Sequence, residues 1–263
     1  MDQLQFNKNI LTRRKTSGID VETTLSHFAI ITYMVEPELL RPHIHERFKL
    51  DCIINDSGEE KALISVVPFL DKDFRFVNLP WIKNSFGQIN YRAYVTDTKT
   101  GENVAWFFGT SLDSLSVYIP KFVWKLPWHK SKITFDVDYN KKTDKYSLYK
   151  IKSISKWASL DIEIEDTGKA PESLLGFPDL ETGLVLLTHP LKGYFYLNNG
   201  KLGHYSIWHD QLKTTVGNIV NSNISLFPKL GLDTKSKPIT SHSVLIQANT
   251  DFTIYLPPVS IKE

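Results

Sequence analysis

The chain has little cysteine and little excess charge. Cys52 is the only cysteine among 263 residues, so no disulfide can form within the chain. The 31 basic and 29 acidic residues leave a formal net charge of +2, which predicts no broad electrostatic surface for nucleic acid or anionic lipid. We therefore expect neither a nucleic-acid partner nor a membrane partner.

Long apolar runs are also missing. The longest, FAIITYMV and GLVLL, are far shorter than the roughly 20 residues that a membrane-spanning helix needs. The N-terminus has no apolar core of the kind found in a secretory signal. These absences predict a soluble cytoplasmic protein, and they leave its oligomeric state open.

Several catalytic and cofactor motifs are absent. The sequence has no G-x-x-x-x-G-K-[ST], no G-x-G-x-x-G after a strand, no G-x-S-x-G and no H-E-x-x-H. His43 and His45 follow Pro37 in a predicted short helix, where residues two apart point to different sides. We expect no cofactor and no metal site, and we interpret Cys52 as an unreactive residue of a buried strand.

Strand-forming residues dominate what is present. The 263 residues include six Trp, eleven Tyr and fifteen Phe, and alternating apolar segments recur between turns. We expect a loose N-terminal arm at 1–18 and one β-rich domain over 19–263, with an irregular loop at 70–87. The clearest strands are HFAIITYMV, LDCIIND, KALISVVPF, KITFDVDY, KYSLYKIKSI, ASLDIEIED, LGHYSIWHD, SVLIQA and DFTIYL.

Three carboxylates share one face of the predicted strand ASLDIEIED, namely Asp161, Glu163 and Glu165. Buried together they would repel one another, so we expect them to face water opposite Lys150 and Lys152 of a neighbouring strand. A catalytic carboxylate pair is the alternative interpretation.

The segment 86–128 contains the most informative pattern. Period-2 geometry puts Gln88, Asn90, Arg92 and Tyr94 on one strand face and apolar or aromatic residues on the other. A buried guanidinium needs polar partners, so this face lies either in water or around an internal polar site.

The same segment resembles a known family. GQINYRAYVTDTKTGENVAWFFGTSLDSLS, followed by KLPW, is similar to the E-x-N-x-R-T-Y-V, F-F-S-L-D and L-P-Y signatures of the YqjF-like proteins. This uncharacterised, mainly bacterial family is grouped with the acetoacetate decarboxylase-like superfamily. The likeness extends upstream to about residue 27. It implies a β-rich α+β domain with a few short helices, in which a curved, mostly antiparallel sheet closes in a barrel- or cone-like way around a cavity. It implies no established activity.

The resemblance also marks a candidate catalytic residue. Pro120 and Lys121 resemble the Pro-Lys pair that carries the imine-forming lysine of the decarboxylases, but Gln88 stands where the family usually has a glutamate. Gln88 cannot titrate. Lys125 follows Lys121 by four residues on a predicted helix, a spacing that favours two solvated lysines. We therefore expect no decarboxylation of acetoacetate.

Three functional hypotheses follow. In the first, the protein binds a small organic molecule, anionic ones included, through Arg92, and the other ligand-binding candidates are Gln88, Asn90, Tyr94, Asp113 and His209. In the second, it is a lyase or related enzyme that acts on a keto acid or carbonyl compound through Lys121. In the third, Arg92 is purely structural and pairs with a buried carboxylate such as Asp113.

Overall fold

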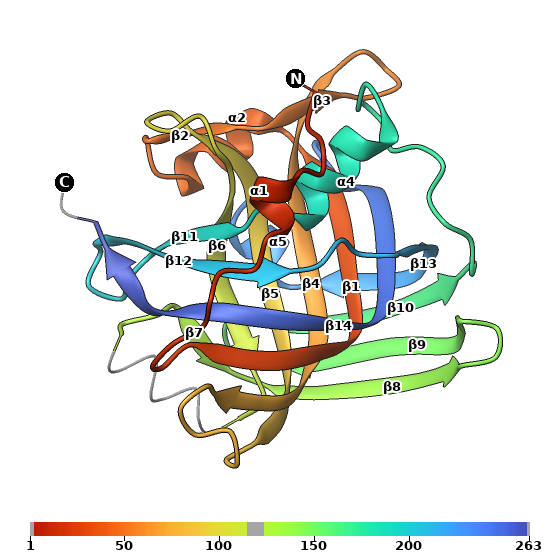
Figure 1. The fold of residues 1–263 in the computed structure, drawn as a ribbon. Coiled ribbons are helices and arrows are strands. Elements are labelled where there is room, and N and C mark those ends of the chain that lie inside the picture. Colours follow the sequence, from red (N-terminus) through yellow and green to blue (C-terminus); the bar gives the residue numbers. More distant parts are fainter. Residues whose placement is uncertain (1–2, 115–123, 262–263) are drawn as a thin grey trace.

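The computed structural model of the chain describes residues 3–114 and 124–261. Most of them belong to one 14-stranded sheet, with a few short helices at its margins (Figure 1). The strands are β1 (Val21–Val35), β2 (Phe48–Leu50), β3 (Cys52–Ile54), β4 (Glu60–Phe76), β5 (Asn84–Asp97), β6 (Asn103–Leu112), β7 (Trp128–Lys130), β8 (Lys132–Asn140), β9 (Lys145–Ile154), β10 (Leu160–Asp166), β11 (Lys192–Tyr196), β12 (Leu202–His209), β13 (Thr215–Ile224) and β14 (Thr240–Ser260).

The helices are short. They are α1 (Lys8–Leu11), α2 (Pro37–Leu40), the 3-10 turn η1 (Arg41–His43), α4 (Leu180–Thr188) and α5 (Leu226–Lys229). Pro37 begins α2 as expected, because proline suits the first turn of a helix. No helix in the described ranges is both long enough and apolar enough to cross a bilayer.

Seven strands of the sheet form a ring in the order β1-β4-β5-β6-β11-β12-β14, and β14 returns to pair with β1. The sheet then continues from β14 through β13, β10 and β9 to β8. Two of the described strand pairings are parallel, β6 with β11 and β6 with β7, and the others are antiparallel. The predicted curved, mostly antiparallel β-rich fold is confirmed.

The two faces of the ring strands bury different residues. On one face, Tyr91 of β5 packs with Tyr149 of β9 and Ile162 of β10 in the largest apolar cluster. On the other face, Val67 and Phe69 of β4 pack in a second cluster. Leu186 and Leu187 of α4 join that second cluster, so α4 covers the interior of the ring from one side (Figure 1).

Two parts of the chain differ from the sequence expectations. The irregular loop expected at 70–87 is wrong, because β4 continues to Phe76 and β5 begins at Asn84. The polar end of β4 pairs with β1 and β5, and this pairing overrides its low strand propensity. Strand β13 was not expected at all, because its mostly exposed Thr, Asn and Ser residues hide the alternation.

The N-terminal segment lies against the sheet. The Leu4 amide donates a hydrogen bond to the Thr182 hydroxyl (3.2 Å), and the Trp208 indole donates one to the Leu11 carbonyl (2.9 Å). Asn7 caps the short helix α1. The expected looseness of residues 1–18 concerns motion and stays a prediction.

The carboxylates of β10 face lysines of β9. Lys150 lies 3.1 Å from Glu163 and Lys152 lies 3.4 Å from Asp161, and all four side chains are at least one third exposed. The expected solvated ion pairs are confirmed.

Arg47 and Asp97 form an ion pair that is largely shielded from water. Arg47 donates two hydrogen bonds to Asp97, at 2.8 and 2.6 Å, and the Asp97 side chain is 0 % exposed. The hydrogen bonds from Arg47 lower the pKa of Asp97. This pair ties the turn between β5 and β6 to the segment before β2.

Replacing Arg47 by Met tests the importance of this pair. We expect a loss of about 3 kcal/mol in the free energy of unfolding, because Asp97 is left buried without its cation. The exposed Lys150→Met variant is the matched control and should change the free energy by less than about 0.5 kcal/mol. Urea titrations measure both values, and equal effects would contradict the assignment.

Candidate functional site

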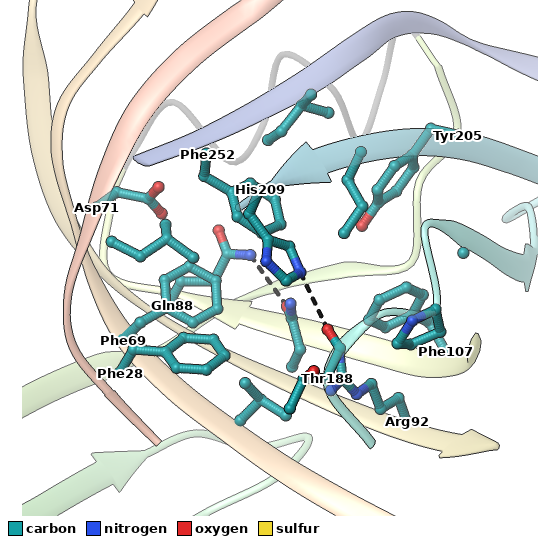
Figure 2. Close-up of a pocket in the computed structure, with 17 residues that line it drawn as sticks. Phe28, Phe69, Asp71, Gln88, Arg92, Phe107, Thr188, Tyr205, His209 and Phe252 are labelled. Carbon is teal, nitrogen blue, oxygen red and sulfur yellow. Dashed lines mark hydrogen bonds between the residues drawn. The ribbon is translucent and has the colours of Figure 1, made fainter. Parts of the chain in front are cut away.

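A small chamber lies inside the ring, on the face of β5 that carries its polar side chains. Its volume is about 40 Å³, and β1, β4, β5, β6, β12, β14 and the end of α4 contribute to its wall. Figure 2 shows side chains from these elements converging on the chamber. The polar ones are Asp71, Gln88, Asn90, Arg92, Thr188, Tyr205 and His209.

Arg92 is the strongest charge in this chamber. It is 6 % exposed, and its Nη2 donates a hydrogen bond to the carbonyl of Leu187 in the last turn of α4 (2.8 Å). Within 3–114 and 124–261 no carboxylate forms an ion pair with it, and its buried Nε has no hydrogen-bond partner. Burial of a guanidinium costs free energy because the group loses its hydration, and here no opposite charge offsets that cost.

Asp71 is a second incompletely bonded group. It is 2 % exposed, and its Oδ1 accepts a hydrogen bond from the hydroxyl of Thr23 (3.0 Å). Its Oδ2 has no partner. Burial raises the pKa of Asp71 from 3.8 to about 7, so at neutral pH a large share of the molecules carry it protonated.

His209 contacts two carbonyl oxygens. Its Nδ1 lies 2.8 Å from the carbonyl of Asp210 and its Nε2 lies 3.0 Å from that of Thr188. Burial, with a smaller contribution from the nearby charge of Arg92, lowers the pKa of His209 to about 4. The ring is therefore neutral at neutral pH, and only one of the two contacts is a donated hydrogen bond.

Gln88 and Asn90 are joined by a hydrogen bond. The Gln88 amide donates to Asn90 Oδ1 (3.0 Å), which also accepts from the Thr110 hydroxyl (3.0 Å). The half-buried Tyr205 stands on the opposite side of the chamber (Figure 2), and burial raises the pKa of its phenol. The side-chain oxygen of Asn90 thus already accepts two hydrogen bonds, and the Tyr205 hydroxyl belongs to the lining of the chamber.

A second, apolar chamber, which we call the outer chamber, adjoins the first, the inner chamber. Its volume is about 170 Å³, and it shares Gln88, Tyr205 and Ile254 with the inner chamber. The exposed Ile82 and Asn84 lie at its edge. Most of its wall is aromatic or aliphatic, with contributions from Phe74, Phe76, Phe86, Trp124, Leu126, Trp128 and Leu256.

The residues predicted from the sequence separate into three groups. Gln88, Asn90, Arg92 and His209 line the inner chamber. Tyr94 lies beneath Arg92, where its hydroxyl contacts Ser65 (2.7 Å) and donates to Leu187 (3.2 Å). Asn90 and Arg92 point inward and lie within hydrogen-bond reach of other polar groups, so the polar face of β5 surrounds an internal polar site and does not lie in water.

Asp113 does not join this group. Asp113 pairs with Lys130 (3.1 Å) and accepts from the amide of Ile133 (3.3 Å), outside both chambers. The idea that Asp113 neutralises Arg92 is therefore wrong. Lys121, with the helix expected around it, lies outside the described residues.

Sequence reasoning missed Asp71 and Tyr205. Asp71 continues the period-2 alternation of Val67 and Phe69, so it was detectable once β4 was extended beyond Phe69. Tyr205 and His209 are four residues apart on one strand, which places them on one face. No group of three or more metal-ligating side chains occurs in the part of the chain that the structure describes.

The fold defines the class of protein. Solved structures share it at low identity, among them the enduracididine biosynthesis enzyme MppR with bound HEPES buffer (10% identity, 94% of this chain and 89% of that one, TM-score 0.60). An acetoacetate decarboxylase-like enzyme from Sphingomonas wittichii RW1 also matches, at 9% identity over 94% of this chain and 95% of that one, with a TM-score of 0.60. The acetoacetate decarboxylase of Legionella pneumophila subsp. pneumophila strain Philadelphia 1 matches at 15% identity over 96% of this chain and 92% of that one, with a TM-score of 0.55. These likenesses establish an acetoacetate decarboxylase-like fold.

The particular family follows from the sequence. Residues 22–249 match the model of DUF2071, described as an uncharacterised conserved protein, and the chain belongs to this family. The resemblance to the YqjF-like proteins is thereby confirmed. A search of curated proteins gives no match.

The raised pKa of Asp71 predicts a pH-dependent stability. The unfolded chain ionises Asp71 near pH 3.8 and the folded chain near pH 7, so wild type loses stability as pH rises between these values. The gap of about 3 pKa units corresponds to about 4 kcal/mol. Relative to wild type, Asp71→Asn should gain up to about this amount above pH 7 and nothing below about pH 4.

Urea titrations of both proteins at pH 4, 6 and 8 measure this gain. The exposed Asp73, two residues further on, supplies the control Asp73→Asn, which should shift by less than about 0.5 kcal/mol at every pH. A gain for Asp71→Asn that does not vary with pH would contradict the assignment.

Proposed function

We propose that the protein binds a small organic acid in the inner chamber, with the carboxylate of the acid against Arg92. The observation that carries the proposal is the buried guanidinium whose Nε has no partner and for which no counter-ion is found among the described residues. A carboxylate supplies both the missing acceptor and the missing charge.

The chamber suits the head of such a molecule. A volume of about 40 Å³ is roughly three to four times the minimum that holds one water molecule, enough for a carboxylate and its adjoining carbon. Protonated Asp71 offers an Oδ2–H donor, and Tyr205 offers its hydroxyl. A protein of similar fold, MppR, is described as complexed with pyruvate, a small carboxylate, which is consistent with this choice.

Removing Arg92 tests the binding. Propanoate and pyruvate should bind to wild type, and Arg92→Met should weaken both by at least about 30-fold, because a charge-assisted pair is lost. Arg92→Lys keeps the charge without the fork geometry and should lie between the two. Isothermal titration measures each affinity.

The matched control is Arg75→Gln. Arg75 lines the outer chamber but is paired with Glu22 (2.9 Å), so its loss should change the affinity less than about threefold. If Arg92→Met binds as wild type does, the proposed site is wrong.

A stability measurement separates this proposal from a purely structural Arg92. An arginine without a counter-ion contributes little to folding, so Arg92→Met should leave the free energy of unfolding within about 1 kcal/mol of wild type, or raise it. Tyr94 continues to donate to Leu187 in the variant. A loss of 3 kcal/mol or more in urea titrations would favour the structural role.

A lyase that acts on a keto acid is the second candidate. It is favoured by the decarboxylase-like fold and by Asp71, an ionisable group with a pKa near 7 in the chamber where Gln88 cannot titrate. The chamber wall contains no lysine from 3–114 or 124–261, so imine formation would rest on Lys121.

We expect no enzymatic release of carbon dioxide from acetoacetate and no borohydride-stable adduct with pyruvate. Carbon dioxide release and intact-protein mass spectrometry after reduction measure the two. Release or trapping by wild type that Lys121→Ala abolishes would establish the lyase instead.

A further inference from the structure

The carboxylate of the proposed acid occupies the inner chamber and leaves the outer chamber free. The outer chamber adjoins the inner chamber along Gln88, Tyr205 and Ile254, and it opens toward solvent near Ile82, which is 52 % exposed. A molecule entering at this edge passes the aromatic wall before it meets Arg92. The second chamber thus stands where the remainder of a bound acid would lie.

We propose that the ligand is an arylalkanoic acid: a carboxylate in the inner chamber, a short linker between Gln88 and Tyr205, and one aromatic ring in the outer chamber. This inference rests on the proposed binding of an organic acid at Arg92. It adds the chemical class of the part that does not contact Arg92.

The size of the outer chamber limits its occupant to about one ring. Its volume is about 170 Å³, and an apolar cavity of about 150 Å³ is known to bind one benzene molecule. A long acyl chain would exceed this space. The inner chamber is about four times smaller, since it measures about 40 Å³, so the ring has only one of the two places to go.

The lining of the outer chamber favours an aromatic ring over an alkyl group. Phe74 and Phe86 meet at 5.2 Å between ring centroids with an interplanar angle of 55°, and Trp124 and Trp128 complete the wall. Tilted aromatic neighbours present both edges and faces, which a further ring can match in edge-to-face or offset geometry.

Electrostatics fix the orientation of the ligand. Among the described residues that line the outer chamber, the cation is Arg75, and Glu22 already pairs with it at 2.9 Å. The cation of the inner chamber, Arg92, has no such partner among the described residues. The carboxylate therefore belongs inside and the ring outside.

Three probes test the inference on the full chain by isothermal titration: sodium propanoate, 3-phenylpropanoate and the uncharged 3-phenylpropan-1-ol. We expect 3-phenylpropanoate to bind about 20-fold more tightly than propanoate, as six added carbon atoms of ordinary ligand efficiency provide. The alcohol should bind at least about tenfold more weakly than the acid of the same skeleton.

Variants locate the ring. Trp124→Ala should weaken 3-phenylpropanoate about fivefold to tenfold and leave propanoate unchanged, because only the ring contacts Trp124. The matched control is Trp81→Ala. Trp81 is 73 % exposed and lines neither chamber, so its loss should change nothing. If Trp124→Ala does not fold, Asn84→Trp, which adds bulk at the edge of the outer chamber, should weaken 3-phenylpropanoate selectively.

Different results would contradict the acid site at Arg92 and the placement of the aromatic ring. Equal binding of propanoate and 3-phenylpropanoate, both lost in Arg92→Met, would overturn the aromatic ring and leave the acid site standing. Binding of neither acid, or binding indifferent to Arg92→Met, would overturn the proposed function and this inference with it. An effect of Trp81→Ala equal to that of Trp124→Ala would also overturn the placement of the ring.

Discussion

The pairing of β1 with β14 is the constraint on which the rest of the structure depends. It runs from Val21 opposite Ile254 to Met34 opposite Thr240 and closes the seven-strand ring. Without it, the polar face of β5 would lie on an open sheet in contact with water. Closure instead puts both faces of β5 inside the protein, one against β9 and β10 and the other around the chamber. Every polar side chain on that second face then needs a partner or remains unsatisfied.

Because the ring is closed, Arg92 is enclosed in the chamber, and no carboxylate among the described residues neutralises it. Burial shifts titratable groups near Arg92 toward their neutral forms, raising the pKa of Asp71 and lowering that of His209. The guanidinium of Arg92 thus lies among groups whose charged forms are disfavoured. An anion entering the chamber would reduce the field of Arg92 at His209. If the proposed acid binds beside Arg92, its binding and the protonation of His209 would be coupled through space.

The sequence predicted much of this fold because its strongest local patterns agree with the global structure. The alternation in β5 placed Gln88, Asn90 and Arg92 on one face, and the segment LGHYSIWHD predicted a strand where β12 lies. Where local signals were weak, the prediction failed. The polar end of β4 is a strand only because β1 and β5 pair with it, and β13 only because β10 does.

The same limit applied to the site. Asp71 was hidden inside the supposed loop, and the aromatic chamber combines residues from β4, β5, β7 and β12 that are far apart in sequence. Asp113 is the converse case. Its place after β6 made it a plausible partner for Arg92, but it points away to Lys130 and the amide of Ile133. Which residues share a chamber is decided by ring closure, a long-range property that no local window of sequence contains.

The closure of the ring also has a consequence for biosynthesis. β1 is made early, and its partner β14 follows more than 200 residues later. During translation, at about 5–20 residues per second, the edge of β1 that pairs with β14 stays unpaired until β14 has been made. The chamber cannot form before β14 has been made, because Phe252 and Ile254 of β14 are part of its wall. A nascent chain that has made β4 but not β14 therefore carries β1 as an open edge of the sheet.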